Sequence, residues 1–130
     1  MSILNKLKNL IKNGIQKKVP DDSGNIQKVQ VGFLGQIKNI KQITPYGFYS
    51  SSVNGSNWVL FSSRANSDDL QGIGNDYKNR PKNLKEGEVV LQNLLTGAYI
   101  KLDAEGNINI ITDKDIIAEC NNADLTCIGK

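Results

Sequence analysis

The side chains that could support chemistry in this sequence lie mainly in its last third. The segment 103–107 (Asp-Ala-Glu-Gly-Asn) gathers carboxylate and amide oxygens as a calcium loop does, and Asp113 and Asp115 flank Lys114 shortly after it. The first segment lacks the remaining ligand spacing and the distal glutamate of an EF-hand. The second has no neighbouring apolar pocket that would separate two carboxyl pKa values for acid–base work. We interpret both segments as polar turns.

Cysteine and histidine chemistry is also restricted. The 130 residues include two cysteines, Cys120 and Cys127, and no histidine. Without histidine there is no Ser-His-Asp triad, no Cys-His pair and no histidine-ligated zinc or iron. Two thiols at this spacing make a poor metal site and a poor disulfide framework, so we expect them to pack as small hydrophobic groups. The sequence therefore predicts a non-enzymatic protein with no catalytic residue, metal or cofactor, although lysine, tyrosine and carboxylates remain available as bases.

Charge is distributed unevenly along the chain. Residues 1–18 hold five lysines and no acid, so the rest of the chain carries a small negative net charge although the total is +3. The body of the protein is thus not a basic nucleic-acid surface. No apolar run approaches the roughly 18 residues that cross a bilayer. The lysine-interrupted start has no small-residue cleavage site, so we expect synthesis and folding in a cytoplasm.

Residues 1–18 predict an amphipathic N-terminal helix. Apolar side chains recur at nearly helical spacing between Ile3 and Ile15, with lysines mostly between them. A helix this short is marginal alone in water, so we expect it to dock on its own domain or on a neighbouring subunit. A helix lying on a membrane surface is the alternative. The breaker-rich residues 19–25 predict a linker after it.

Residues 26–86 predict a small OB-like β-barrel. Short strands are expected near 29–33, 57–62 and 70–73, with a further strand at 47–50 and a tight turn at Asn54-Gly55. Ile37, Ile40 and Ile43 recur every three residues, and we interpret this segment as a twisted or bulged strand, with a helical turn as the alternative. Five short strands fit an OB fold, with an SH3-like barrel as the alternative. We expect the aromatic residues of this region to pack in the core rather than to stack on nucleic-acid bases. They are Phe33, Tyr46, Phe48, Tyr49, Trp58 and Phe61.

Residues 87–130 predict a ladder of very short strands with a period near eight, at 89–92, 98–102, 107–110, 116–120 and 125–128. Each strand offers a pair of inward apolar candidates two residues apart, which places both on one face. The pairs are Ile100 and Leu102, Ile108 and Ile110, Ile116 and Ala118, and Leu125 and Cys127. A single chain of such units encloses no core and leaves its edges unpaired. We therefore expect three chains to pool these eight residues in an intertwined β-helix, and an antiparallel meander packed on the barrel is the alternative.

Several segments between residues 45 and 111 resemble the phage Mu baseplate spike family, also described as the baseplate assembly protein V group. The most specific is Leu-Lys-Glu-Gly-Glu-Val at 84–89, which is followed by a glycine turn and two apolar strands. The others are Pro-Tyr-Gly-Phe at 45–48, Asn-Gly at 54–55 leading into Val-Leu-Phe at 59–61, the polar stretch 75–81, and the strands at 97–102 and 106–110.

The resemblance implies a mainly β protein with an OB-like domain followed by an intertwined trimeric β-helix. It implies a homotrimer on the axis of a contractile tail, in the baseplate of a virion or tail-like particle, which is assembled in the bacterial cytoplasm and helps to puncture the target cell envelope. The implied partners are baseplate hub and tail tube proteins. Some spikes of this family end in an apex that binds iron through histidines, and this chain has no histidine, so either a separate spike-tip protein caps it or the sequence is a piece of a longer chain. No nucleic-acid partner is expected. The alternative function is an OB-fold module that binds single-stranded nucleic acid.

Overall fold

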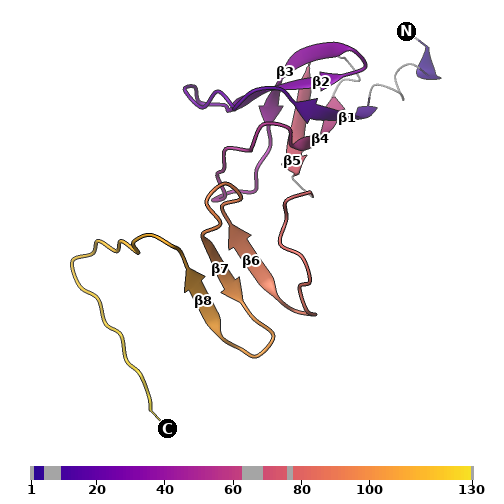
Figure 1. Cartoon of the computed structure of the whole chain (residues 1–130). Helices are drawn as coiled ribbons and strands as arrows, with labels where there is room; N and C mark the ends of the chain where they lie inside the picture. The colour runs from indigo at the N-terminus through magenta and orange to yellow at the C-terminus, as the bar shows by residue number, and fades with distance from the viewer. Residues whose placement is uncertain (1, 5–9, 63–68, 76–77, 130) are drawn as a thin grey trace. The chain divides into compact units, whose positions relative to one another are not determined.

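The computed structural model describes residues 2–4, 10–62, 69–75 and 78–129, and their structure is mainly β (Figure 1). The chain divides into two compact units, Met1–Arg80 and Pro81–Lys130. The sequence placed this boundary a few residues later, between residues 86 and 87. Each unit is described by itself below.

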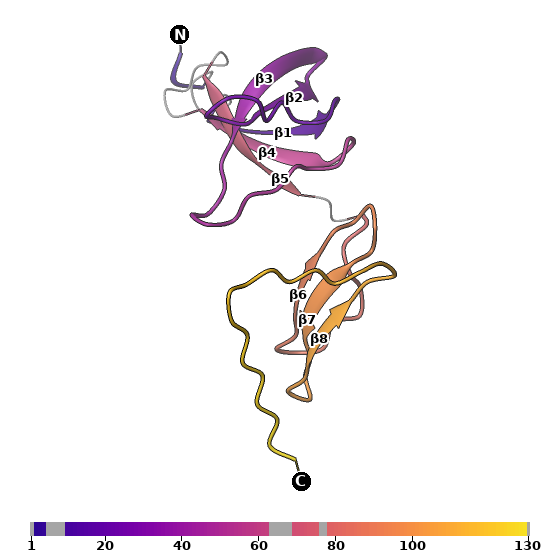
Figure 2. The same ribbon diagram turned by 90° about the vertical axis from the view of Figure 1, so that its left-hand side faces the viewer.

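The first unit contains a closed five-stranded β-barrel. Its strands are β1 (Ile11–Gln16), β2 (Lys28–Phe33), β3 (Gln36–Gln42), β4 (Asn57–Ser62) and β5 (Leu70–Asn75), in the order β1-β2-β3-β5-β4. Pairing of β1 with β4 closes the barrel, and the pairing of β3 with β5 is parallel whereas all the others are antiparallel (Figure 2). The small barrel expected from the sequence is thus present.

The barrel core follows the period-two alternation of its strands. Every second residue of β2 and β4 points inward, and the apolar ones are almost completely buried. These core residues are Val29, Val31, Phe33, Ile40, Trp58, Leu60 and Leu70. Full burial stabilises the fold by about 1.5–3 kcal/mol for each large aliphatic or aromatic side chain, so this cluster carries most of the unit's hydrophobic stabilisation.

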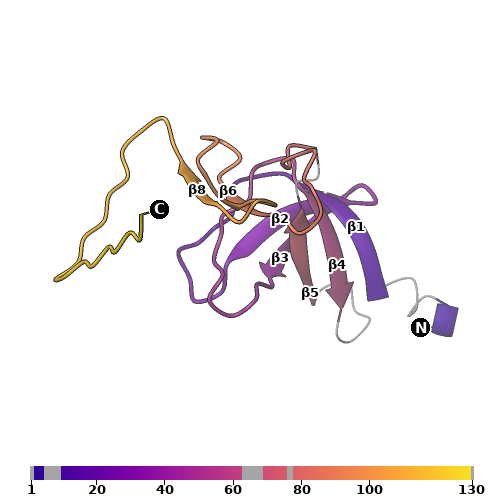
Figure 3. The same cartoon turned by 90° about the horizontal axis from the view of Figure 1, so that it is seen from below.

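The N-terminal helix expected over residues 3–15 is wrong from Ile11 onward, because Ile11–Gln16 form β1; residues 5–9 lie outside the described residues. Figure 3 shows β1 beside β4, whose open edge it fills. Its pattern is inverted with respect to the core, since Ile11 and Ile15 are exposed whereas Gly14 and Gln16 are buried. Pairing with the edge of β4 therefore stabilises this segment as a strand more than the helical spacing of its isoleucines would stabilise a helix.

Gly14 shows why a small residue faces the barrel interior. A Cβ at this position would overlap Val31 Cγ1 and would lie 3.0 Å from the Gly32 carbonyl oxygen. We expect Gly14→Ala to lower the free energy of unfolding by about 1–3 kcal/mol through overpacking. Urea unfolding followed by the fluorescence of Trp58, the single tryptophan, measures this directly. Gly24→Ala is the matched control, because the nearest atom to its Cβ would be 3.8 Å away, and an equal loss in both variants would contradict the explanation.

Glycines also set the turns of this unit. The turn from Pro45 to Phe48 is closed by a 3.0 Å hydrogen bond that the Phe48 N–H donates to the Pro45 carbonyl, with Gly47 at a φ of 85°. The strand expected at 47–50 is therefore wrong, because positive φ at Gly47 turns the chain instead. The tight turn expected at Asn54-Gly55 is confirmed, with Gly55 at a φ of 88°.

The second unit contains a three-stranded antiparallel sheet. Its strands are β6 (Val89–Gln92), β7 (Tyr99–Leu102) and β8 (Ile108–Ile111), in sequence order. These are the first three strands of the ladder that the sequence predicted. After β8 the chain runs on without further strands as far as residue 129, so the single chain shows a three-stranded meander and does not show the β-helix expected of three chains (Figure 1).

Candidate interaction surface of the second unit

The strand register of the second unit brings six aliphatic side chains to one face of the sheet. Residues directly opposite each other in an antiparallel pair share a face, so each register row can be followed across all three strands. One row runs Val89, Leu102, Ile108, and the next runs Leu91, Ile100, Ile110. We call these six residues the apolar face.

The apolar face is uncovered. Its residues range from 43% exposed at Ile100 to 68% exposed at Ile108. A sheet normally buries one face against another layer, and an exposed contiguous apolar patch marks an interaction site in soluble proteins. No described residue of this unit is buried, so the unit has no hydrophobic core of its own.

The opposite face is held by polar contacts. The Glu88 carboxylate lies 3.3 Å from the Lys101 ammonium and accepts hydrogen bonds from the backbone N–H groups of Lys85, at 2.8 Å, and Ala104, at 3.1 Å. These bonds, the one from Lys85 foremost, hold the pKa of Glu88 below its usual value. The Glu88 carboxylate thus links the turn before β6 to β7 and to the β7–β8 turn. These contacts help to keep the strands in register, so the apolar residues stay in their rows although the unit has no buried core.

Asp103 organises the β7–β8 turn in the same way. Its Oδ1 accepts hydrogen bonds from the N–H groups of Glu105 and Asn107, and its Oδ2 accepts from the side-chain amides of Asn107 and Asn109. The bond from the Asn107 N–H is the largest cause that lowers the pKa of Asp103 to about 2. Both oxygens are engaged by nitrogen donors, which suits a turn and leaves little capacity for a cation.

The Asp103 turn is expected to loosen in acid. The folded pKa of Asp103 is about 2 against an ordinary value of 3.8. A lowered folded pKa means that its contribution to stability is complete above the ordinary value and is lost as the pH falls through the folded one. A carboxyl titration followed by NMR should give a midpoint near 2, and Asp103→Asn should remove the pH dependence of the turn amides between these values. A midpoint at or above 3.8 would contradict the hydrogen-bond pattern.

The eight residues predicted for the oligomer core fall into two groups. Ile100, Leu102, Ile108 and Ile110 are brought together on the apolar face. The other four lie exposed in the extended chain that follows β8, and the structure does not bring them to that face; they are Ile116, Ala118, Leu125 and Cys127.

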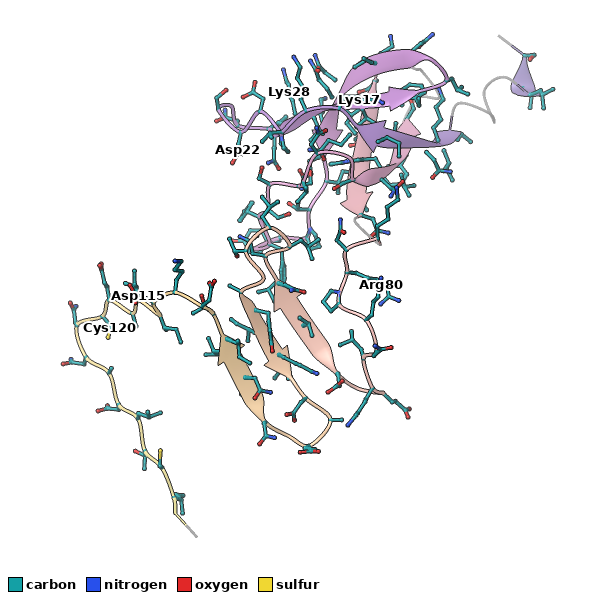
Figure 4. The ribbon with its side chains drawn as sticks, viewed as in Figure 1. Lys17, Asp22, Lys28, Arg80, Asp115 and Cys120 are labelled. Carbon is teal, nitrogen blue, oxygen red and sulfur yellow. The ribbon has the colours of Figure 1, made fainter. Side chains whose placement is uncertain are left out.

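Both cysteines are free and exposed in the single chain, whereas the sequence predicted packed thiols. Figure 4 labels Asp115 and Cys120 on the extended chain that follows β8. In that segment the chain makes no strand pairs that would bury a thiol.

Val89 and Leu91 were missed as members of this face. The signal was in the sequence, because residues 89–92 were expected to form a strand and residues two apart share a face. Only the register, with Val89 opposite Leu102 and Leu91 opposite Ile100, shows which of the two faces they join.

No protein-family model matches this chain, and a search of curated proteins finds no match. Among the described residues no cluster of three or more acidic, cysteine or histidine side chains could hold a metal ion, and no helix in that part of the chain is long and apolar enough to span a bilayer.

Proposed function

We propose that this chain is a structural spike protein, in which three copies cover one another's apolar faces. The observation that carries the proposal is the pair of three-residue aliphatic rows that lies exposed on the β6–β7–β8 sheet. Burying such a face removes apolar area from water and stabilises by about 25 cal/mol per Å², and the described residues of the second unit offer no second layer of their own to bury it.

Copies of the same chain are the occupants that fit this face best. It carries only Val, Leu and Ile, so it presents no charge or buried hydrogen-bonding group that would demand a specific polar partner. Soluble homo-oligomers close through cyclic symmetry, and a threefold axis would bring three such faces together around one line. The apolar pairs at Ile116 and Leu125 continue the same period, and in this proposal they gain partners only when the three chains wind together as a β-helix.

The barrel supports the OB-like part of the proposal. It has five strands, a β1-β2-β3 meander and a long connection from β3 to β4. This connection carries the chain to the position between β5 and β1, as in a Greek-key barrel. In the proposed spike this domain is the collar that joins the ladder to baseplate hub and tail tube proteins. In this proposal the N-terminal segment contacts the same proteins.

The contractile-tail setting comes from the resemblance to the phage Mu baseplate spike family. The most specific segment, 84–89, forms a turn in which Gly87 has a φ of 85° and the Glu88 N–H donates to the Lys85 carbonyl at 3.1 Å. The pattern thus places a glycine where positive φ is required and a glutamate where three donors converge. The role is mechanical, because the driven spike must resist buckling and an intertwined ladder shares load over many hydrogen bonds.

Electron cryo-microscopy of tail-like particles that contain this chain tests the proposal. We expect three copies on the particle axis, below the tube, with β6, β7 and β8 around the threefold line. Density for the chain in the sheath would contradict the proposed role, and so would assembled particles that lack the chain.

The alternative, a module for single-stranded nucleic acid, has one observation in its favour. Tyr46, Phe48 and Tyr49 are exposed on the β3–β4 connection and not packed in the core as expected, whereas Phe33 and Trp58 are buried. Stacking on bases is normally accompanied by cations that bind the phosphates, and no lysine or arginine lies between residues 42 and 63. Salt-sensitive binding of a labelled oligothymidylate, measured by fluorescence anisotropy, would support this alternative.

A further inference from the structure

A hollow of about 360 Å³ lies in the barrel unit between the β1–β2 connection and the chain that follows β3. It involves neither the second unit nor the apolar face. Ten residues line it, drawn from 22–27 and from the end of β3 to residue 51. Concave sites with a few convergent polar groups are where small ligands bind, so its lining decides what it could hold.

One wall of the hollow is an exposed aromatic ring on a well-anchored loop. Tyr49 lines the hollow and is 83% exposed. Just after it, the Ser52 hydroxyl donates to Gln16 Oε1 at 2.6 Å and the Ser52 carbonyl accepts from Gln16 Nε2 at 3.2 Å. Just before it, the Pro45–Phe48 turn closes on itself. The ring is therefore presented to solvent by a segment that is bonded to β1 just after it and contains a closed turn just before it, which lowers the entropy cost of using it for binding.

The remaining polar lining is almost entirely neutral. It consists of amide and hydroxyl side chains, and among the described residues that line the hollow Asp22 alone is charged; Figure 4 shows Asp22 on the β1–β2 connection. The neutral members are Asn25, Gln27, Gln42, Thr44, Ser50 and Ser51. Such groups both donate and accept hydrogen bonds, so they suit a ligand that also does both.

One of these groups has an unused hydrogen-bonding atom. Gln42 Oε1 is buried and accepts no hydrogen bond from the described residues, while Gln42 Nε2 reaches the Ser50 carbonyl only at 3.5 Å. A buried acceptor without a donor is costly and uncommon in folded proteins. The long bond to Ser50 holds the Gln42 amide only weakly, so rotation of this side chain toward the hollow would let a ligand hydroxyl supply that donor.

We propose that this hollow binds a neutral carbohydrate. A sugar ring presents C–H groups that pack on an exposed aromatic face and a ring of hydroxyls that donate and accept, which matches Tyr49 on one side and the amides and hydroxyls on the other. An anionic phosphate or nucleic acid would meet Asp22 and no cation among the lining residues. A purely apolar ligand would leave the amides unpaired.

Solution NMR of the full chain tests the proposal, with maltotriose, cellotriose and chitotriose as probes. We expect at least one trisaccharide to shift amide signals confined to residues 22–27 and 42–51, with a dissociation constant of about 1 mM or tighter. Tyr49→Ala should weaken that binding about tenfold. Tyr46→Ala is the matched control, because Tyr46 is 99% exposed on the same loop and does not line the hollow, so it should leave the affinity unchanged.

Three results would overturn the proposal. The first is the absence of localised shifts with all three sugars. The second is an equal loss of affinity in Tyr46→Ala and Tyr49→Ala, which would indicate non-specific contact with the loop. The third is tighter and salt-sensitive binding of an oligothymidylate at the same residues, which would assign the hollow to nucleic acid. Trp58 fluorescence verifies that each variant is folded, since that ring is buried in the barrel.

Discussion

Replacing Ile110 with aspartate is expected to convert the proposed trimer into single chains. Ile110 lies in a row of the apolar face, opposite Ile100, and is 56% exposed in the isolated chain. In a threefold assembly the substitution would bring three carboxylates into one apolar interior. An unpaired buried charge costs several kcal/mol, so the association should be lost while the barrel, which does not contain this residue, stays folded. Sedimentation velocity measures the change of mass directly.

Ile111→Asp is the matched control for that variant. Ile111 is the next residue of β8, has a similar exposure of 48%, and lies on the opposite face of the sheet, across from Tyr99. It should keep the mass of the unmodified protein. If both variants dissociate, the effect comes from damage to β8 and not from the apolar face. If neither dissociates, this face does not hold the oligomer together.

The largest effect on the barrel itself is expected at Gln16. Its side chain is 1% exposed and sits inside a strand-built core. Gln16 Oε1 accepts from the Trp58 indole N–H at 3.1 Å and from the Ser52 hydroxyl, and Gln16 Nε2 donates to the carbonyls of Lys18, at 2.7 Å, and Ser52. Methionine has nearly the same length and volume and can replace none of these bonds. We expect Gln16→Met to lower the free energy of unfolding by about 2–4 kcal/mol, because buried groups lose their partners.

Urea unfolding followed by Trp58 fluorescence measures this loss, which should lower the transition midpoint and leave its steepness unchanged. Gln30→Met is the control, because Gln30 lies on the neighbouring strand β2 and points away from the core. It should change stability by no more than about 0.5 kcal/mol. A Gln16 variant as stable as the Gln30 variant would mean that the buried amide contributes no net stabilisation.

Local signals predicted most of the strands. The segments at 29–33, 57–62, 89–92 and 98–102 carry alternating or β-branched residues bounded by turn residues, and each overlaps an observed strand. The turn at Asn54-Gly55 likewise depends only on local backbone preference. These elements were predictable because their own residues specify them.

Strand β1 was not predictable in this way. Its inward residues are Gly14, which is required because Val31 fills the space, and Gln16, whose amide is satisfied by Trp58 and Ser52. Both reasons involve contacts with residues distant in the sequence. The outward isoleucines therefore resembled a helical stripe, and only closure of the barrel shows which side of the segment is buried.

The two candidate surfaces differ in the same respect. The apolar face was largely predictable, because the period-two spacing of Ile100 with Leu102 and of Ile108 with Ile110 determines a shared side. The hollow beside Tyr49 was not, because it depends on how the β1–β2 connection lies against the chain after β3. Nothing local to the aromatic residues distinguishes an exposed Tyr49 from a buried Trp58.

The native mass of the full chain in solution tests most directly whether copies of this chain cover the apolar face. Multi-angle light scattering should give three times the 14.3 kDa of one chain, and this mass should persist on dilution to about micromolar concentration. A mass of 14.3 kDa under the same conditions would show that no second copy covers the apolar face in solution, and would contradict the trimer.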